Sequence, residues 1–297
     1  MSPAEGFGAV VGGIQLTDFI PVGGIASGGI EFVKGHGTEN DFILLPDPAG
    51  TLEVSESQVR ALCDRHAGIG ADGVIRVAPS QPGSAAPFVM DYRNADGSLA
   101  EMCGNGARLF ARFLVDSGWA PAGSVAFETR GGRRVANVPS SGEVTVEMGP
   151  VRLGRPSSTT VSGRQIHGVA ADVGNPHLVC LTDIDLAELD LSRQPAFDSA
   201  VFTGGVNIEF VTVLGPGSVQ MRVHERGVGE TRSCGTGTVA VAAAYLSSVG
   251  RSTGTVRVAV PGGMVTVGIT DDDSTLTGPA VVIASGTIEQ GFWDRHR

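Results

Sequence analysis

The chain has 297 residues, of which 41% are hydrophobic and 18% charged, and its mean hydropathy is +0.14. These values are typical of a globular protein with room for about two domains, and they exclude a disordered chain. The 31 acidic and 21 basic residues give a net charge of −10. A chain this acidic is repelled by phosphate backbones and anionic lipids, so we expect no nucleic acid and no membrane among its partners.

The first 33 residues contain no lysine or arginine and are rich in apolar residues and glycine. A secretory signal begins with basic residues, and a spanning helix needs about 20 predominantly apolar residues, whereas Asp18 and Pro21 interrupt this stretch. We therefore expect residues 1–30 to be a disordered or dispensable extension.

Lys34, which follows, is the one lysine among the 21 basic residues. Pyridoxal phosphate enzymes hold their cofactor as a lysine aldimine, and no phosphate-binding loop lies near Lys34. We therefore expect chemistry that needs no cofactor.

Beyond Lys34, short β-branched runs alternate with turn residues, which predicts mostly antiparallel sheets. Helical periodicity is confined to Ser57–His66 and to the segments after Cys103 and Cys234. The expected strands are Asp41–Leu45, Gly73–Val77, Phe88–Tyr92, Ser124–Thr129, Glu143–Met148, Gly168–Val173, His177–Leu181, Asn207–Val213, Val219–His224, Thr255–Val260, Met264–Ile269 and Ala280–Ser285.

Two of the expected helices begin in the same way, with C-G-N-G-A at Cys103 and C-G-T-G-T at Cys234. The second, Thr238–Val249, is apolar on nearly every face and must be buried. A repeated unit of this kind predicts an α+β fold of two pseudo-symmetric domains, each a mostly antiparallel sheet curled around a central helix.

Polar residues precede the two cysteines at matching distances. Asn94 and Glu225 stand nine residues before Cys103 and Cys234, in turns that contain glycine. Farther upstream each half has an asparagine in a turn, Asn40 in one and Asn175 in the other. Each half therefore looks like one copy of a unit that presents a thiol at the start of a buried helix.

A thiol at a helix N-terminus faces unpaired backbone amides and the positive end of the helix dipole, which favour the thiolate. The same amides bind carboxylates, and the flanking glycines allow a ligand to come close. Two such sites facing each other can hold one carboxylate with a sulfur on either side of the neighbouring carbon. This arrangement suits inversion of a stereocentre, in which one thiolate removes a proton and the other thiol returns one.

The four cysteines differ in their surroundings. Cys63 and Cys180 lie in a helical stretch and an apolar strand without flanking glycines, so we expect them to be packing residues. Zinc sites use closely spaced pairs such as C-x-x-C, which this chain lacks, and four cysteines do not make a disulfide scaffold. We expect a cytoplasmic protein with reduced thiols and no metal site, in which a redox pair of Cys103 and Cys234 remains an alternative.

The sequence resembles the diaminopimelate epimerase family, especially its actinobacterial members, from about residue 30 to the end. The resemblance implies the family's fold, in which the last strand returns to the first domain. It implies a first domain of residues 31–147, completed by residues 281–297, and a second domain of residues 148–280. The resemblance also implies conversion of LL-2,6-diaminopimelate to the meso isomer without a cofactor, in lysine and peptidoglycan precursor synthesis, by a homodimer. The motifs that carry it are KGHGTENDF (34–42), GADG (70–73), DYRNADGS (91–98), MCGNGAR (102–108), VGNPH (173–177), GVN (205–207), HERGVGETRSCGTGT (224–238) and PGG (261–263).

The resemblance also implies roles for individual residues. Cys234 would take the α-proton of the LL isomer, and Cys103 would donate one to the opposite face. The amides of Gly104, Asn105, Gly235 and Thr236 would hold the reacting carboxylate, with Asn40 close to the reacting centre. The distal amino acid group would be read by Asn94, Asn175, Asn207, Glu225 and Arg226, and the thiol pKa values would be tuned by His177 and Glu225.

Two departures and two alternatives accompany this prediction. Gly73 stands where many family members have glutamine, and residues 1–29 have no counterpart in the family. Proline or hydroxyproline racemases share the fold and the two cysteines, but their first motif usually has histidine where Asn105 stands. A noncatalytic amino-acid-binding or thiol-redox protein on the same duplicated unit is the alternative of another class.

Overall fold

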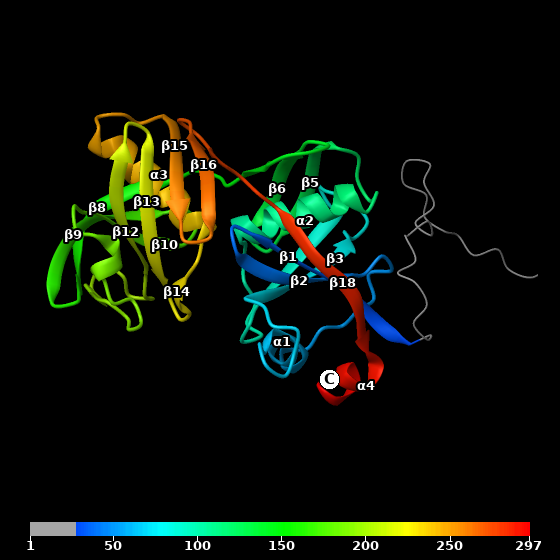
Figure 1. Ribbon diagram of the computed structural model, residues 1–297. Helices are drawn as coiled ribbons and strands as arrows, with labels where there is room; N and C mark the ends of the chain where they lie inside the picture. The colour runs from blue at the N-terminus through cyan, green and yellow to red at the C-terminus, as the bar shows by residue number, and fades with distance from the viewer. Residues whose placement is uncertain (1–27) are drawn as a thin grey trace, which may run out of the picture.

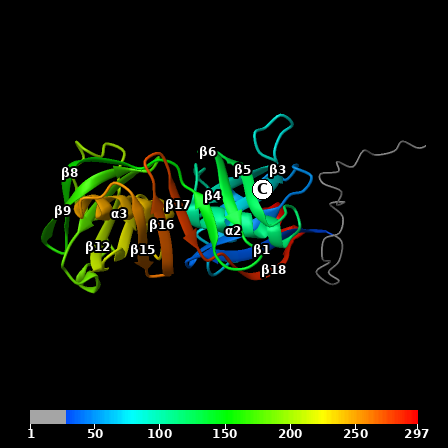
Figure 2. The same cartoon turned by 90° about the horizontal axis from the view of Figure 1, so that it is seen from above.

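The computed structural model describes residues 28–297, and it consists of two halves that lie side by side. In each half a curled sheet surrounds one central helix, α2 (Gly104–Asp116) or α3 (Gly235–Ser248) (Figures 1 and 2). The predicted extension lies outside the described residues as far as residue 27. Among the described residues, no helix combines the length and the apolar run that crossing a membrane requires.

The remaining elements follow in chain order. The N-terminal half contains β1 (Gly29–Gly37), β2 (Asn40–Pro46), α1 (Glu56–Cys63), β3 (Gly73–Pro79), β4 (Phe88–Asn94), β5 (Gly123–Thr129), β6 (Gly132–Val138) and β7 (Val144–Glu147). The C-terminal half contains β8 (Arg152–Val161), β9 (Arg164–Asp172), β10 (Pro176–Leu181), the 3-10 turn η1 (Leu186–Glu188), β11 (Ala196–Phe197), β12 (Asn207–Gly215), β13 (Ser218–Glu225), β14 (Gly229–Thr231), β15 (Gly254–Val260), β16 (Gly263–Ile269) and β17 (Ser274–Gly278). The chain ends with β18 (Val281–Glu289) and α4 (Gln290–Arg295).

Strand pairing repeats between the halves. The parallel pairs β2–β3 and β4–β5 have the counterparts β10–β12 and β13–β15, and the other pairings are antiparallel. The registers also correspond, because Phe42 faces Gly73 in one half as His177 faces Asn207 in the other. The prediction of mostly antiparallel, repeated sheets is confirmed.

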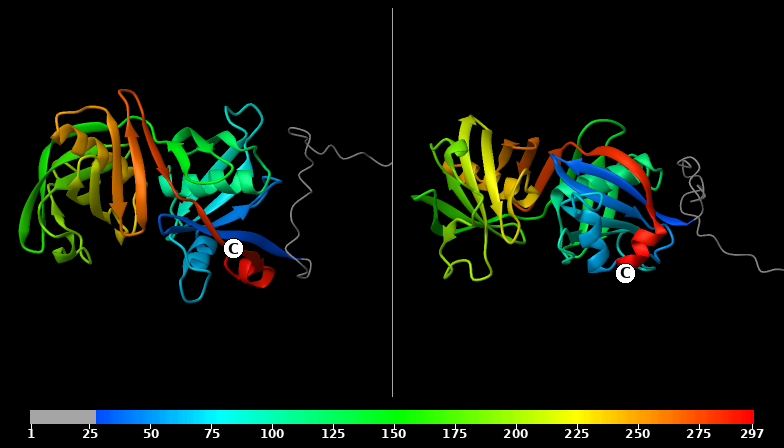
Figure 3. Two further views of the ribbon diagram at one scale, coloured as in Figure 1. Left: turned by 45° about the horizontal axis from the view of Figure 1, so that its top comes forward. Right: turned by 60° about the horizontal axis from the view of Figure 1, so that its bottom comes forward.

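The halves are joined by an exchange of strands. β7 pairs with β17 where the two sheets meet. The strand that follows each of these crosses to the other half, so β8 pairs with β9 and β18 pairs with β1 (Figures 1 and 3). The last strand, β18, thus lies beside the first strand of the N-terminal half.

The two central helices form the core. Leu109 and Phe110 of α2 are fully buried, and Phe110 packs against Phe127 of β5 with ring centroids 5.0 Å apart. Helix α3 is buried on every face from Val239 to Leu246, as its uniformly apolar sequence predicted.

Helix α1 differs from its predicted bounds of 57–66. It begins at Glu56 because Ser55 and Gln58 form a reciprocal capping box. It ends at Cys63 because the carboxylate of Asp64 accepts the amides of residues 66 and 67 and so turns the chain away from the helix axis.

Candidate active site

Cys103 and Cys234 are the N-cap residues of α2 and α3, as predicted from the repeated glycine motifs. The Sγ atom of Cys103 accepts the amide of Gly106 at 3.5 Å, and that of Cys234 accepts the amide of Gly237 at 3.4 Å. Both thiols therefore use the capping position where serine or aspartate usually stands.

The two helix N-termini are in contact with each other. A methyl group placed on Gly235 would lie 3.0 Å from the Cα atom of Gly104 and 3.3 Å from the amide nitrogen of Asn105. A side chain there would push the two helix starts apart by a few tenths of an ångström, which glycine avoids. The free amides of both helices consequently converge on one region, which suits binding of an anion.

The resting thiols are not activated in the way that their helix positions alone suggested. Burial raises the pKa of Cys103 to about 11, with a contribution from the charge of Glu225, and raises the pKa of Cys234 well above its usual value. The amides of Gly106 and Gly237 lower these pKa values but do not compensate for the loss of solvent. The amides at the helix starts thus favour the thiolate, as expected, but burial of the two thiols has the larger effect on their pKa values.

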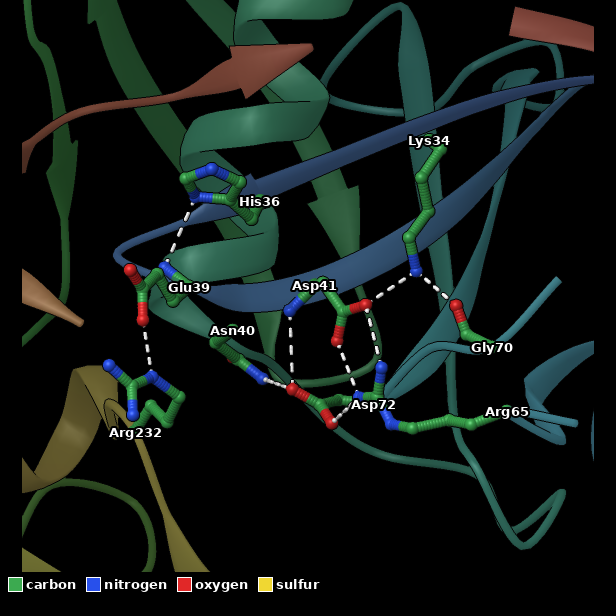
Figure 4. Close-up of polar contacts among 9 residues, drawn as sticks. All are labelled: Lys34, His36, Glu39, Asn40, Asp41, Arg65, Gly70, Asp72 and Arg232. Carbon is green, nitrogen blue, oxygen red and sulfur yellow. Dashed lines mark hydrogen bonds and ion pairs between the residues drawn. The ribbon is translucent and has the colours of Figure 1, made fainter. Parts of the chain in front are cut away.

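Cys103 faces the amide oxygen of Asn40, with 3.6 Å between Sγ and Oδ1. The amide nitrogen of Asn40 donates to Asp72 at 2.8 Å, and Arg65 holds the other oxygen of Asp72 at 2.8 Å (Figure 4). Because Asp72 accepts from the nitrogen of Asn40, the oxygen of Asn40 is the atom turned toward the thiol. Asp72 was not predicted as a site residue.

Lys34 belongs to the same polar network. Its ammonium lies 2.5 Å from the carboxylate of Asp41, which Arg65 also binds (Figure 4). Burial opposes ionisation of Asp41, but the hydrogen bonds and charges of Arg65 and Lys34 outweigh it and lower its pKa to about 2. The network fixes the strand that carries Asn40.

Asn40 follows a strained hairpin turn. Thr38 and Glu39 have φ values of 50° and 58°, a conformation that glycine and asparagine adopt more readily. The turn is clamped from the C-terminal half, since Thr38 Oγ1 lies 2.9 Å from Ser233 Oγ and Arg232 pairs with Glu39 (Figure 4). Contacts between the halves therefore stabilise the turn that positions Asn40.

The side chain of Asn105 connects the two halves. Its amide nitrogen donates to Asn40 at 3.2 Å and to the hydroxyl of Ser233 at 3.1 Å, and its oxygen accepts from Arg108 at 2.9 Å. Arg108 is fully buried, and burial lowers its pKa to about 10. Its guanidinium nevertheless lowers the pKa of Cys103, so it adds positive charge beside that thiol.

Cys234 stands at the end of a hydrogen-bonded chain. Its Sγ lies 3.6 Å from the hydroxyl of Thr236, which accepts from the amide nitrogen of Asn175 at 3.3 Å. The oxygen of Asn175 lies 3.0 Å from Nε2 of His177, and Nδ1 of His177 lies 2.6 Å from Oε1 of Glu209. Both His177 and Glu209 are fully buried, and the second oxygen of Glu209 has no partner among the described residues.

Glu225 lies close to both thiols. Its carboxylate accepts the hydroxyl of Thr231, and burial raises its pKa. Its charge is among the causes that raise the pKa of Cys103 and of Cys234. The charge of Glu225 therefore affects the pKa of both thiols.

The other residues predicted to read the distal group lie on the strand ends around the thiols. The backbone amide of Arg226 donates to Asn207 at 2.9 Å, and its exposed guanidinium donates to the carbonyl of Gly204 at 3.0 Å. Asn94 ends β4 on the opposite half, where its oxygen accepts from Tyr92 at 2.9 Å. Among the described residues no carboxylate pairs with Arg226, so its fork is available to a ligand carboxylate.

The comparisons with known proteins agree with this geometry. The family model described as diaminopimelate epimerase matches residues 32–154 and 169–283. The chain belongs to the diaminopimelate epimerase family. Among its curated relatives, the diaminopimelate epimerase of Rhodococcus jostii is 48% identical over 286 residues, which cover 89% of this chain and 99% of the relative. That of Mycobacterium ulcerans is 49% identical over 287 residues, which cover 90% and 99%.

Solved structures share the fold of this diaminopimelate epimerase family member at low identity. A hydroxyproline epimerase from Agrobacterium vitis has a TM-score of 0.63 and 17% identity, with 88% of this chain and 93% of that chain covered. A phenazine biosynthesis protein of the PhzF family from Bacillus anthracis has a TM-score of 0.62 and 16% identity, with 87% and 98% covered. These likenesses confirm the two-domain architecture and carry no information on substrate.

Residues near the site that the sequence analysis missed include Asp72, Tyr92 and Glu209. A glutamate in the otherwise apolar run of β12 was a signal that could have drawn attention to Glu209. Asp72 sits inside the family motif GADG, and Tyr92 inside DYRNADGS, but their contacts depend on strand register and not on spacing along the chain.

Proposed function

We propose that this protein is a cofactor-independent epimerase that converts LL-2,6-diaminopimelate to the meso isomer. The reaction would supply lysine and peptidoglycan precursors in the cytoplasm, and the enzyme would act as a homodimer. The observation that carries the proposal is the pair of thiols at the starts of two touching helices, in a chain about half identical to curated diaminopimelate epimerases.

The converging amides support a role in stabilising the carbanion. The α-carboxylate of the substrate would bind to the amides of Gly104, Asn105, Gly235 and Thr236, where the charge that develops on removal of the α-proton is spread. Cys234 would remove the proton of the LL isomer, and Cys103 would return a proton to the opposite face. Neither step requires a bound cofactor.

The thiol that acts as base must first lose its own proton. Glu225 interacts electrostatically with both thiols and burial raises its pKa, so we assign it the role of taking that proton. The ammonium of the substrate would then offset the negative charge that opposes formation of a thiolate. His177 would tune the same thiol through Asn175 and Thr236.

Recognition of the distal amino acid group would distinguish diaminopimelate from smaller amino acids. The planar fork of Arg226 suits a second carboxylate, and Glu225 suits a second ammonium. Asn94, Asn175 and Asn207 would complete the polar surroundings of that group.

The test is exchange of the α-proton in deuterated water. With LL-diaminopimelate the reduced protein should incorporate deuterium at C2 and form the meso isomer, whereas proline in the same assay should remain unchanged. No exchange with a folded, reduced sample would contradict catalysis and favour a binding or redox protein. Exchange with proline alone would favour a proline-type racemase.

Cysteine substitutions test the two-thiol mechanism. Cys103→Ala and Cys234→Ala should each abolish net epimerisation, because inversion needs a group on both faces. Cys63→Ala and Cys180→Ala are the matched controls, since these buried thiols lie in the core away from the helix starts. Near-normal turnover without either Cys103 or Cys234 would refute the mechanism, and sedimentation equilibrium tests the homodimer.

A further inference from the structure

The two halves differ at one position of the site where their strand registers correspond. Gly73 faces Phe42 across the parallel pair β2–β3, and Asn207 faces His177 across the equivalent pair β10–β12. Asn207 carries a polar side chain that accepts a hydrogen bond from the amide of Arg226, whereas Gly73 carries none. The N-terminal half therefore lacks, at Gly73, the polar side chain that Asn207 provides in the C-terminal half.

The ring of Tyr92 occupies the space that a side chain at position 73 would need. A methyl group on Gly73 would lie 2.6 Å from Cε2 of Tyr92 and 2.5 Å from the carbonyl oxygen of Arg93. The ring packs edge-on against Phe42, with centroids 5.7 Å apart and an interplanar angle of 81°. The C-terminal half has the smaller Val223 at the position equivalent to Tyr92. In the N-terminal half, the larger side chain is therefore on β4 and the smaller residue, Gly73, is on β3.

The hydroxyl of Tyr92 fixes one residue of the site. It donates to Oδ1 of Asn94 at 2.9 Å, while Nδ2 of Asn94 donates to Ser98 at 3.0 Å. The amide of Asn94 is therefore held in one orientation, and one N–H of its nitrogen remains for a ligand. Burial raises the pKa of Tyr92, with contributions from the charges of Cys103 and Glu225, so the phenol remains a donor and lies within their electrostatic reach.

We propose that Tyr92 is a positioning residue for the distal carboxylate of the substrate, taking the place left by Gly73 and orienting the free N–H of Asn94. The inference rests on the proposed function, because it assumes a substrate with a second amino acid group. A hydrogen bond from the neighbouring strand thus replaces the side chain absent from β3.

The first test compares Tyr92→Phe with the wild type. The ring and its packing remain, and only the donor to Asn94 is lost. KM for LL-diaminopimelate should rise about three- to tenfold, the effect of one neutral hydrogen bond, with kcat changed less than about twofold because the reacting carbon is not involved. Tyr245→Phe is the matched control: this other buried tyrosine accepts the amide of Gly217 at 2.8 Å on the far side of the C-terminal half, and its loss should leave KM unchanged.

The second test is a double-mutant cycle with Asn94→Ala. If Tyr92 acts through Asn94, Tyr92→Phe should raise KM in the wild-type background and have no further effect in the Asn94→Ala background. An unchanged KM in Tyr92→Phe, a loss of kcat alone, or additive effects in the cycle would overturn the inference while the wild type still exchanges the α-proton. A wild type without exchange would instead refute the proposed function, and this inference with it.

Discussion

The carboxylate of Glu225 has two opposite effects on the thiols. As a negative charge it raises the pKa of Cys103 and Cys234, and as a base it would take the proton of Cys234. Removing the charge should therefore make the free thiols more reactive while it makes the enzyme less active. These two consequences can be measured separately.

Glu225→Gln is predicted to speed alkylation of Cys103 and Cys234 and to abolish turnover. The thiolate is the species that reacts, and a thiol with a pKa of about 11 is less than about 1% ionised at pH 8, so lowering the pKa raises the alkylation rate at every pH below it. The measurement is the rate of iodoacetamide labelling of each cysteine between pH 7 and 9.5, followed by mass spectrometry of the peptides.

Cys63 is the internal reference for that measurement. Its pKa of about 12 is set by burial and by charges at Lys34, Asp41, Asp72 and Arg65, and Glu225 is not among the causes. Slower labelling of Cys103 and Cys234 in Glu225→Gln, or an equal acceleration at Cys63, would show that the carboxylate does not control the thiols through its charge.

The buried pair of His177 and Glu209 occupies positions that are apolar in the other half. By strand register they correspond to Phe42 and Ile75, both fully buried. Glu209→Ala leaves a histidine without its partner and should lower the free energy of unfolding by about 3 kcal/mol. The double substitution His177→Phe and Glu209→Ile should recover most of that stability but no epimerase activity, since the chain to Cys234 is gone.

Urea unfolding of both variants, with turnover measured on the same samples, tests this prediction. A single variant as stable as the wild type would mean that the pair contributes little to the fold. Full activity in the double variant would mean that the chain through Asn175 and Thr236 is unnecessary.

Sequence alone located the two cysteines that begin the central helices, and it missed several residues whose contacts depend on strand register. The matched C-G-x-G contexts placed Cys103 and Cys234 correctly at two helix starts. Glu209 and Tyr92 reach the site because two strands pair in one register and not another, and a single sequence does not contain that information. The raised thiol pKa values likewise follow from burial in three dimensions.

The contact between the starts of α2 and α3 brings the two thiols and the free amides of both helices together. Gly235→Ala would place a methyl group 3.0 Å from the Cα atom of Gly104, and the helices would have to separate. Because a displacement of about 1 Å at reacting groups costs about a hundredfold in rate, a shift of a few tenths of an ångström should lower kcat/KM about threefold to tenfold, with a smaller effect on the melting temperature.

Gly215→Ala provides the control for this prediction. Gly215 ends β12, its backbone needs no positive φ, and a methyl group there meets nothing within 4 Å. The control should keep the activity of the wild type. If Gly235→Ala also keeps it, close approach of the two helix starts is not required for catalysis.

The helices were easier to predict from the sequence than the turns that connect the strands. Uniform apolarity marked α3 as a buried helix, and Gly118 and Gly250 marked where α2 and α3 end. The turn at Thr38 and Glu39 has no glycine to reveal its positive φ values, because contacts from the other half hold it in place. Such a turn cannot be read from local sequence.

Across the whole molecule, strand exchange ties the two halves to each other. Each half is completed by a strand that arrives from the other, and β7 and β17 pair at the junction, where the hydroxyls of Thr145 and Thr277 lie 2.8 Å apart. The sequence implied the return of β18 through its family resemblance. The implied second domain, from residue 148, already includes β8, but β8 was not among the expected strands.

The pairing of β18 with β1 predicts which residues at the start of the chain the fold needs. β1 pairs with β18 from its first residue, Gly29 opposite Glu289, and Ile30 packs in the cluster that includes Trp293. Because the described fold is already complete from β1 onward, we propose that residues 1–27 are dispensable. A chain that begins at Gly28 should melt within about 2 °C of the full chain and keep its kcat/KM, whereas one that begins at Phe32 loses three ladder positions and should melt several degrees lower. Melting curves and epimerase assays on the two truncated chains test the boundary. Loss of activity in a folded chain that begins at Gly28 would assign the first 27 residues a role in catalysis.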